Sequence, residues 1–123
     1  EPAYDLAFRY IRDQWQKGDA IVGPLPSIPA VYLGRCDGYM LQNDFEEYLV
    51  WQNGQPTDRW TSAPLIDSAE SFEKHFGHQR RVWFAVDNIR WEQRYTPEFR
   101  AYIEQTMEIV YQAYGVTVYR YSA

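Results

Sequence analysis

The chain has almost no cysteine: Cys36 is the only one in 123 residues, so no disulfide can form within it. A reducing compartment fits this composition, but disulfide-free domains also occur outside the bacterial cytoplasm, and both locations stay open at this point. Long apolar runs are missing as well, since no stretch approaches the roughly 20 residues of a membrane-spanning helix. The sequence therefore predicts no transmembrane segment among these 123 residues.

Positive charge is scarce. Twelve basic residues stand against seventeen acidic ones, which gives a formal net charge of −5. Nonspecific binding to nucleic acid depends on clustered Lys and Arg, and the nearest cluster, Arg80-Arg81, is too short to provide it. We therefore expect no nucleic-acid partner.

No complete catalytic or nucleotide-binding motif is present. The segment Gly23-Pro24-Leu25-Pro26-Ser27 stands where a nucleotide-binding fold would place its phosphate loop. It lacks the G-x-G-x-x-G pattern, and its prolines lack the amide hydrogens that bind phosphate. No G-x-S-x-G pattern places a serine for nucleophilic attack. The sequence therefore predicts no catalytic residue and no cofactor.

Metal ligands are not grouped at a convincing spacing either. His75 and His78 are close in sequence, but Gly77 is expected to end the helix between them, so the two rings would not share a helix face. The acidic residues Asp44 and Glu46-Glu47 are typical of a solvated surface. We predict no metal site.

The sequence is rich in aromatic residues: five Trp, eleven Tyr and six Phe make up 18% of the chain. Each buried ring removes about 150–250 Å² from water, so large rings must fill much of the core. Two short apolar runs, residues 20–23 and 82–86, end abruptly in turn or polar residues. Such runs are typical of strands in a parallel sheet that is covered on both faces.

The chain length predicts one domain, residues 1–123. We expect an α/β fold, a three-layer Rossmann-like sandwich with a mainly parallel sheet and helices on both faces. The alternating segments 107–111 and 116–121 are joined around Gly115, and they predict an antiparallel hairpin at the C-terminal edge.

Local signals predict the remaining elements. Helices are expected over 4–15, over 28–33 with Ser27 as cap, from Asp67 with Glu70 completing a capping box, and from Pro97 with Thr96 as cap. A short strand is expected over 39–41, a hairpin over 48–52 and 57–61 around Asn53-Gly54, and a polar, aromatic loop over 87–95.

Polar residues follow both apolar runs. Ser27 comes shortly after the first run, and Asp87, Asn88 and Arg90 follow the second. Because open α/β sheets bind ligands in the crevice beyond the carboxyl ends of their strands, these four are the candidate ligand-binding residues. A carboxylate and a guanidinium could orient a polar ligand there. The same residue types also form ordinary turns and surface ion pairs, and both interpretations stay open.

The order of phrases along the chain is more distinctive than any single cluster. It runs from "AFRYIRDQWQKGDAIVG" through "AVYLGRCDGYMLQ", "TDRWTSAPLIDSAESFEKHF" and "RRVWFAVDNIRW" to "TPEFRAYIEQTMEIVYQAYGVTVYRY". Over nearly its whole length the chain resembles the soluble C-terminal region of some bacterial multi-spanning glycosyltransferases, in the broad class of protein mannosyltransferases. The motifs that carry this resemblance are packing residues and turns.

The resemblance implies a location and a partner. In that class the membrane portion uses a polyprenyl-phosphate-linked sugar as donor, and acidic residues in its external loops perform the transfer. None of those loops is in this chain, so no catalytic residue is carried over. The implied location is the extracytoplasmic side of a bacterial cell membrane. The implied partners are the membrane-embedded portion of the same chain and a glycan or lipid-linked sugar. The start at Glu1 instead of Met fits a piece excised from a longer protein.

Three functional hypotheses follow from the sequence. The first is an accessory domain of a membrane glycosyltransferase, inactive when isolated, whose full-length parent is the enzyme. The second is a stand-alone module that binds a small ligand, either a sugar or a nucleotide. The third is an interaction domain that uses exposed Trp and Tyr, because aromatic residues are effective interface anchors.

Overall fold

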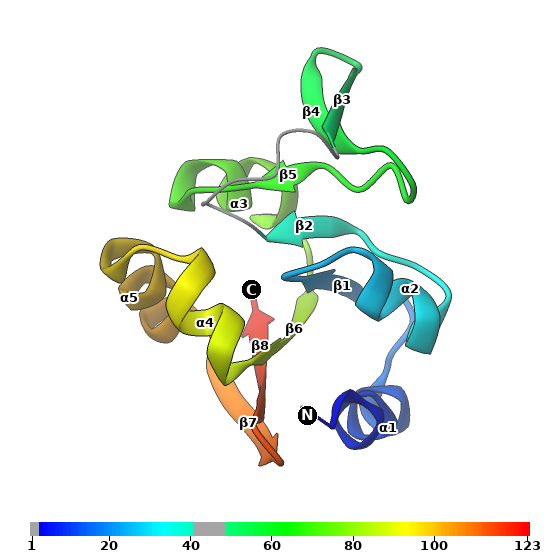
Figure 1. Ribbon diagram of the computed structural model, residues 1–123, viewed down its shortest axis with the longest axis vertical. Helices are drawn as coiled ribbons and strands as arrows, with labels where there is room; N and C mark the ends of the chain where they lie inside the picture. Colours follow the sequence, from blue (N-terminus) through cyan, green and yellow to red (C-terminus); the bar gives the residue numbers. More distant parts are fainter. Residues whose placement is uncertain (1–2, 41–48) are drawn as a thin grey trace.

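The computed structural model describes residues 3–40 and 49–123. Within these ranges the chain forms a six-stranded sheet, a separate two-stranded sheet and five helices (Figure 1). The helices are α1 (Tyr4–Gln14), α2 (Ser27–Leu33), α3 (Ala69–Phe76), α4 (Asn88–Arg94) and α5 (Pro97–Thr106). The strands are β1 (Ala20–Gly23), β2 (Gly38–Met40), β3 (Leu49–Gln52), β4 (Gln55–Asp58), β5 (Leu65–Ile66), β6 (Arg81–Asp87), β7 (Glu108–Ala113) and β8 (Val116–Ser122).

The six-stranded sheet has the strand order β5-β2-β1-β6-β8-β7. Neighbouring strands from β5 to β6 pair in parallel, whereas β8 is antiparallel to both β6 and β7. The predicted mixed α/β fold with a mainly parallel sheet is therefore confirmed, and β7 and β8 form the expected antiparallel hairpin with β7 at the edge. Among the described residues, no helix combines the length and the apolar character needed to cross a bilayer.

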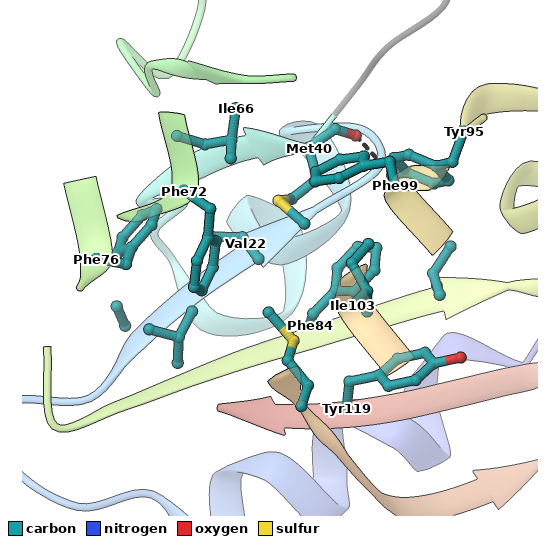
Figure 2. Packing of buried hydrophobic residues seen from close by; sticks show 14 residues of the cluster. Val22, Met40, Ile66, Phe72, Phe76, Phe84, Tyr95, Phe99, Ile103 and Tyr119 are labelled. Atoms are coloured by element: carbon teal, nitrogen blue, oxygen red, sulfur yellow. Dashed lines mark hydrogen bonds between the residues drawn. The ribbon is translucent and has the colours of Figure 1, made fainter. Parts of the chain in front are cut away.

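The core lies on both faces of this sheet, and strand β6 contributes to each. Along a strand, successive side chains point to opposite faces. Val82, Phe84 and Val86 accordingly join one buried cluster, and Trp83 and Ala85 join the other. Side chains of α3 and α5 pack into the first cluster (Figure 2), and side chains of α1 and α2 pack into the second. The helices therefore lie on two sides of the sheet (Figure 1).

Several helix ends follow their sequence signals. Thr96 caps α5, because its Oγ1 accepts a hydrogen bond from the amide of Phe99 at 3.2 Å, and Pro97 occupies the first turn. Gly34 ends α2 in the left-handed conformation, with φ of 74°. Between α4 and α5, the Tyr95 hydroxyl donates to the carbonyl of Met40 at 2.6 Å and so ties this side of the molecule to β2 (Figure 2).

The predicted loop over 87–95 is wrong, because most of this segment is helix α4. Asp87 is its N-cap: one carboxylate oxygen accepts a hydrogen bond from the amide of Arg90 at 3.1 Å. Trp91 and Tyr95 lie four residues apart, which is the spacing of one helix face. In the first core cluster, the Trp91 ring stacks on Tyr119 and the Tyr95 ring meets Phe84 edge-on. The polar composition of the segment concealed this short apolar stripe.

Two predicted caps are also wrong. Ser27 is the first residue of α2, and the preceding Pro26 provides no side-chain cap. Helix α3 is capped by Ser68, and Ser71 completes its capping box. The expected residues, Asp67 and Glu70, each lie one position earlier in the chain. The signal for a helix start was read correctly, but several neighbouring polar residues could serve as cap.

The predicted hairpin is present as β3 and β4, joined by Asn53 and Gly54. Both turn residues have positive φ, 53° and 77°, as a tight turn between right-twisted strands requires. The hairpin forms its own two-stranded sheet and is not an edge of the larger one. Its second strand begins earlier than expected, at Gln55, and ends at Asp58, whose side chain starts the next turn. The two-residue strand β5 was not predicted.

Candidate ligand pocket

A cavity of about 640 Å³ opens where α2, β2 and the end of β4 meet. Its wall is formed by Leu25, Pro26, Ser27, Ala30, Val31, Tyr39, Asp58, Trp60 and Thr61. We call it the α2–β4 pocket. It lies beyond the carboxyl end of β1, where ligands of open parallel sheets bind, and its size falls in the roughly 300–1,000 Å³ range of small-molecule sites.

Proline and glycine determine how the chain enters this pocket. Pro24 and Pro26 follow β1 and prevent the strand from continuing. Gly23 ends the strand directly under α2: a Cβ there would lie 2.8 Å from Cγ of Pro29, closer than such atoms can approach. The absence of a side chain at this position lets the first turn of α2, with Ser27, lie close to the strand end.

The opposite wall depends on Asp58, which is 3% exposed. Its Oδ2 accepts hydrogen bonds from the amides of Trp60 and Thr61, at 3.1 and 2.8 Å, and from the Thr61 hydroxyl at 2.8 Å. The Thr61 hydroxyl in turn accepts a hydrogen bond from the amide of Ala63 at 3.3 Å. These bonds form a tight turn that holds the backbone of Trp60 in place while 76% of this residue remains exposed.

The pocket offers polar groups without positive charge. Among the described residues, its wall includes the Asp58 carboxylate and no Lys, Arg or His. Asp58 uses Oδ2 for the turn, and the exposed Ser27 brings a hydroxyl to the facing wall. Much of the remaining wall is apolar or aromatic. The pocket therefore suits an uncharged ligand that has both an apolar face and hydroxyl groups.

Asp87 and Arg90 are committed to contacts with each other and with α1. The Tyr4 hydroxyl donates to Asp87 Oδ1 at 2.6 Å, and the same hydroxyl accepts a hydrogen bond from the Asp87 amide at 2.7 Å. Arg90 Nη1 donates to Asp87 Oδ1 at 2.9 Å. The Asp87 side chain is only 2% exposed and that of Arg90 is 29% exposed, so this is a partly buried ion pair, and the bond from Tyr4 attaches the N-terminal helix to the end of β6.

The environment of Asp87 predicts a pH dependence of stability. Burial by itself would raise the pKa of Asp87, but the hydrogen bonds from Tyr4 and Arg90 and the positive charge of Arg90 outweigh it, and the pKa lies below its ordinary value. A lowered carboxyl pKa stabilises the folded state in full above the unfolded-state pKa of about 3.9, and this stabilisation is lost as the pH falls through the lower folded-state pKa.

We therefore expect the difference in unfolding free energy between the wild-type protein and Asp87→Asn to stay constant above about pH 5 and to shrink below about pH 4. Urea unfolding at a series of pH values from neutral to acidic measures it. Asp67→Asn, at an exposed residue, serves as control for general acid effects. A difference that persists unchanged at the acid end would contradict this role of the Asp87 charge.

The remaining candidate residues lie in different places. Ser27 lines the α2–β4 pocket. Asn88 is exposed and lines a depression of about 230 Å³ beside the turn between β7 and β8. Its backbone amide donates a hydrogen bond to the carbonyl of Gly115 at 2.9 Å. The four residues singled out in the sequence are thus divided among a pocket, a partly buried ion pair and a surface depression.

Other reactive side chains have local roles. Both ring nitrogens of His75 lie near oxygens, at 3.0 Å from the carbonyl of Ser71 and 2.8 Å from the side chain of Gln55. Burial raises the pKa of the Cys36 thiol to about 12, so little thiolate exists near neutral pH. Residues 3–40 and 49–123 contain no cluster of His, Cys, Asp and Glu able to hold a metal ion. The acidic group Asp44 and Glu46-Glu47 lies outside the described residues.

Sequence reasoning missed the residues of the second wall, Asp58, Trp60 and Thr61. A signal was available, because an Asp followed three residues later by Thr is typical of a turn in which the carboxylate accepts backbone hydrogen bonds. That turn was read as the second strand of the hairpin. The pairing of this turn with Ser27 depends on the fold, since the two are separated by more than thirty residues.

The fold and the site define an α/β domain with a ligand-sized pocket at the carboxyl end of β1, built on α2 and the turn after β4. Comparison with protein-family models, with curated proteins and with solved structures found no match.

Proposed function

We propose that this chain is a non-catalytic domain that binds a neutral sugar in the α2–β4 pocket. The observation that carries the proposal is the composition of the pocket wall. An exposed indole, Trp60, stands beside the Asp58 carboxylate and the Ser27 hydroxyl, with no positively charged side chain in the wall.

The chemistry of sugars matches these groups. One face of a sugar ring presents C–H groups, which pack well against an aromatic ring, and the hydroxyl groups at its rim need hydrogen-bond partners. Asp58 places a carboxylate in the wall as an acceptor, and the hydroxyl of the exposed Ser27 can donate or accept. A nucleotide is supported less well, because its phosphates would face a carboxylate and the proline-rich start of α2.

A parent enzyme is part of the same proposal and rests on the order of phrases along the sequence. We propose that the domain accompanies the membrane-embedded portion of a bacterial glycosyltransferase that uses a polyprenyl-phosphate-linked sugar, on the extracytoplasmic side. There it would hold a glycan near the transfer site. We also propose that its architecture belongs to the three-layer Rossmann-like class, which the helices on both sides of the sheet support. The alternative is a stand-alone sugar-binding module.

The genomic reading frame upstream of Glu1 separates these two versions. Several apolar spans of about 20 residues would support the membrane enzyme. A start codon a few residues upstream would leave the stand-alone module. Sugar transfer catalysed by the isolated domain would contradict the proposal that it is non-catalytic.

The pocket itself is tested by Trp60→Ala. We expect the Kd for a neutral monosaccharide to rise about fivefold to tenfold, because the stacking surface is lost. Stability should change by less than about 1 kcal/mol, because most of this residue is exposed. Ligand-observed NMR titration with mannose, glucose, galactose and N-acetylglucosamine measures the affinity, and urea unfolding measures the stability.

Tyr114→Ala is the matched control. It removes an aromatic side chain that is 74% exposed, in the turn between β7 and β8. It should leave sugar affinity unchanged. The proposal fails if none of the four sugars binds, or if adenosine or uridine nucleotides bind the wild-type protein more tightly than any sugar does.

A further inference from the structure

A second exposed tryptophan, Trp51, lies on the hairpin next to the pocket. Trp51 is 75% exposed and Trp60 is 76% exposed. Exposed aromatic side chains are common in binding sites, because transferring an aromatic surface from water into contact with a ligand is favourable. Trp51 lies outside the wall of the α2–β4 pocket, so the pocket alone does not account for it.

The register of the hairpin places Trp51 on the same face as the pocket. Leu49 pairs with Asp58, and Trp51 pairs with Pro56. Directly paired residues of an antiparallel hairpin project to the same face, and residues two apart on a strand do so too. Leu49, Trp51 and Asp58 therefore share one face of the hairpin.

That face is the one turned toward the body of the domain at its base. Leu49 packs against Tyr39 and Ala63, and Tyr39 lines the pocket together with Asp58. Trp51 lies two residues farther along the strand, about 7 Å toward the tip of the hairpin, which projects from the molecule (Figure 1). In the other direction Trp60 follows Asp58 by two residues. Along the hairpin and the turn after it, Asp58 therefore stands between the positions of the two exposed tryptophans.

We propose that the pocket and this hairpin face form one extended site for a linear, neutral oligosaccharide. Trp60 packs against one sugar unit inside the pocket, and Trp51 packs against another unit that leaves it. Asp58 accepts a hydroxyl hydrogen bond between the two. This inference rests on the proposed function, and it adds that the ligand is a chain of sugars and not a single one.

Charge supports this occupant over a membrane surface. The hairpin and the turn that follows it, residues 49–61, contain one carboxylate, Asp58, and one guanidinium, Arg59, so this segment carries no net charge and is not a basic segment. Anionic lipid surfaces attract basic segments, and a carboxylate between two indoles would oppose insertion. An oligosaccharide requires no positive charge on the protein and no insertion of the protein into a bilayer. Its hydroxyl groups can donate hydrogen bonds to the Asp58 carboxylate.

The experiment compares chain lengths. Isothermal titration calorimetry measures the binding of mannose, glucose and N-acetylglucosamine, and of mannohexaose, maltohexaose, cellohexaose and chitohexaose, to the full 123-residue chain. Its variants are Trp51→Ala, Trp60→Ala and the control Tyr114→Ala. We expect at least one hexasaccharide to bind more tightly than its monosaccharide. Trp51→Ala should raise the Kd of that hexasaccharide about threefold to tenfold and change the Kd of the monosaccharide by less than about twofold.

The other outcomes overturn the inference in distinguishable ways. If Trp51→Ala behaves like Tyr114→Ala while Trp60→Ala weakens binding, the pocket takes a single sugar and only the extended site is wrong. If no sugar binds the wild-type protein, the proposed function fails and the inference fails with it. If Trp51→Ala instead abolishes binding to vesicles of mixed neutral and anionic phospholipid, with no change for any sugar, the indole faces a membrane.

Discussion

Asp87→Ala is expected to destabilise the protein by about 2–4 kcal/mol, because it leaves the buried Tyr4 hydroxyl without its acceptor and removes the cap of α4. The carboxylate accepts hydrogen bonds from Tyr4, from the Arg90 side chain and from the first turn of α4. Without it, the Arg90 guanidinium would remain beside a cavity at the end of β6, and its Nε has no hydrogen-bond partner even in the wild-type protein. The attachment of α1 would weaken at the same time.

Urea unfolding followed by circular dichroism measures this loss. Asn88→Ala is the matched control, because Asn88 is the exposed neighbour of Asp87 on the same helix, and it should change stability by less than about 0.5 kcal/mol. Sugar affinity should be unaffected by either variant under conditions where the protein is folded. A variant at Asp87 that keeps full stability but loses sugar binding would show that this carboxylate contacts ligand.

Trp83→Ala is expected to have an effect of similar size, about 3–5 kcal/mol, through loss of packing. Trp83 is completely buried in the central strand β6, and the guanidinium groups of Arg81 and Arg120 lie 5.0 and 5.5 Å from its ring centre. Its indole Nε1 donates to Asp19 Oδ2 at 2.9 Å. Removing the ring would leave a large cavity and take a donor from a carboxylate whose Oδ1 already lacks a partner.

Trp83→Phe keeps the measurement informative if Trp83→Ala does not fold. Phe retains most of the packing but not the N–H, so we expect a loss of about 1.5–3 kcal/mol, the usual contribution of a hydrogen bond to a charged group. Thermal and urea unfolding of both variants test this order. Equal stability of Trp83→Phe and the wild-type protein would mean that the bond to Asp19 contributes nothing.

The sequence predicted much of the fold because its strongest signals are local. The apolar run at 82–86 became the central strand β6, and the Asn53-Gly54 pair became the turn of the hairpin. The Thr96-Pro97 pair began α5 where expected. Each of these signals acts through the conformation or burial of adjacent residues, so it can be read without knowing the tertiary structure.

The site was harder to predict because it depends on contacts between distant segments. Asp87 followed a strand and was charged, but nothing nearby in the sequence indicated that Tyr4 would bury it. The segment with Asp58 and Trp60 has a sequence that predicted a strand, although Trp60 lies in a turn. Only the parallel pairing of β1 and β2 brings α2 to that turn. Of the residues expected at the crevice beyond the carboxyl ends, Ser27 lines the α2–β4 pocket.

The most direct test of the account is an NMR titration of the isotope-labelled chain with mannohexaose, maltohexaose, cellohexaose and chitohexaose. We expect at least one of them to shift the signals of the Ser27 amide, the Thr61 amide and the Trp60 indole, with the signals of Asn88 and Arg90 unchanged. The account would be contradicted if no signal moves with any of the four sugars. It would be contradicted equally if the shifts cluster around Asp87 and Arg90 and leave the α2–β4 pocket unaffected.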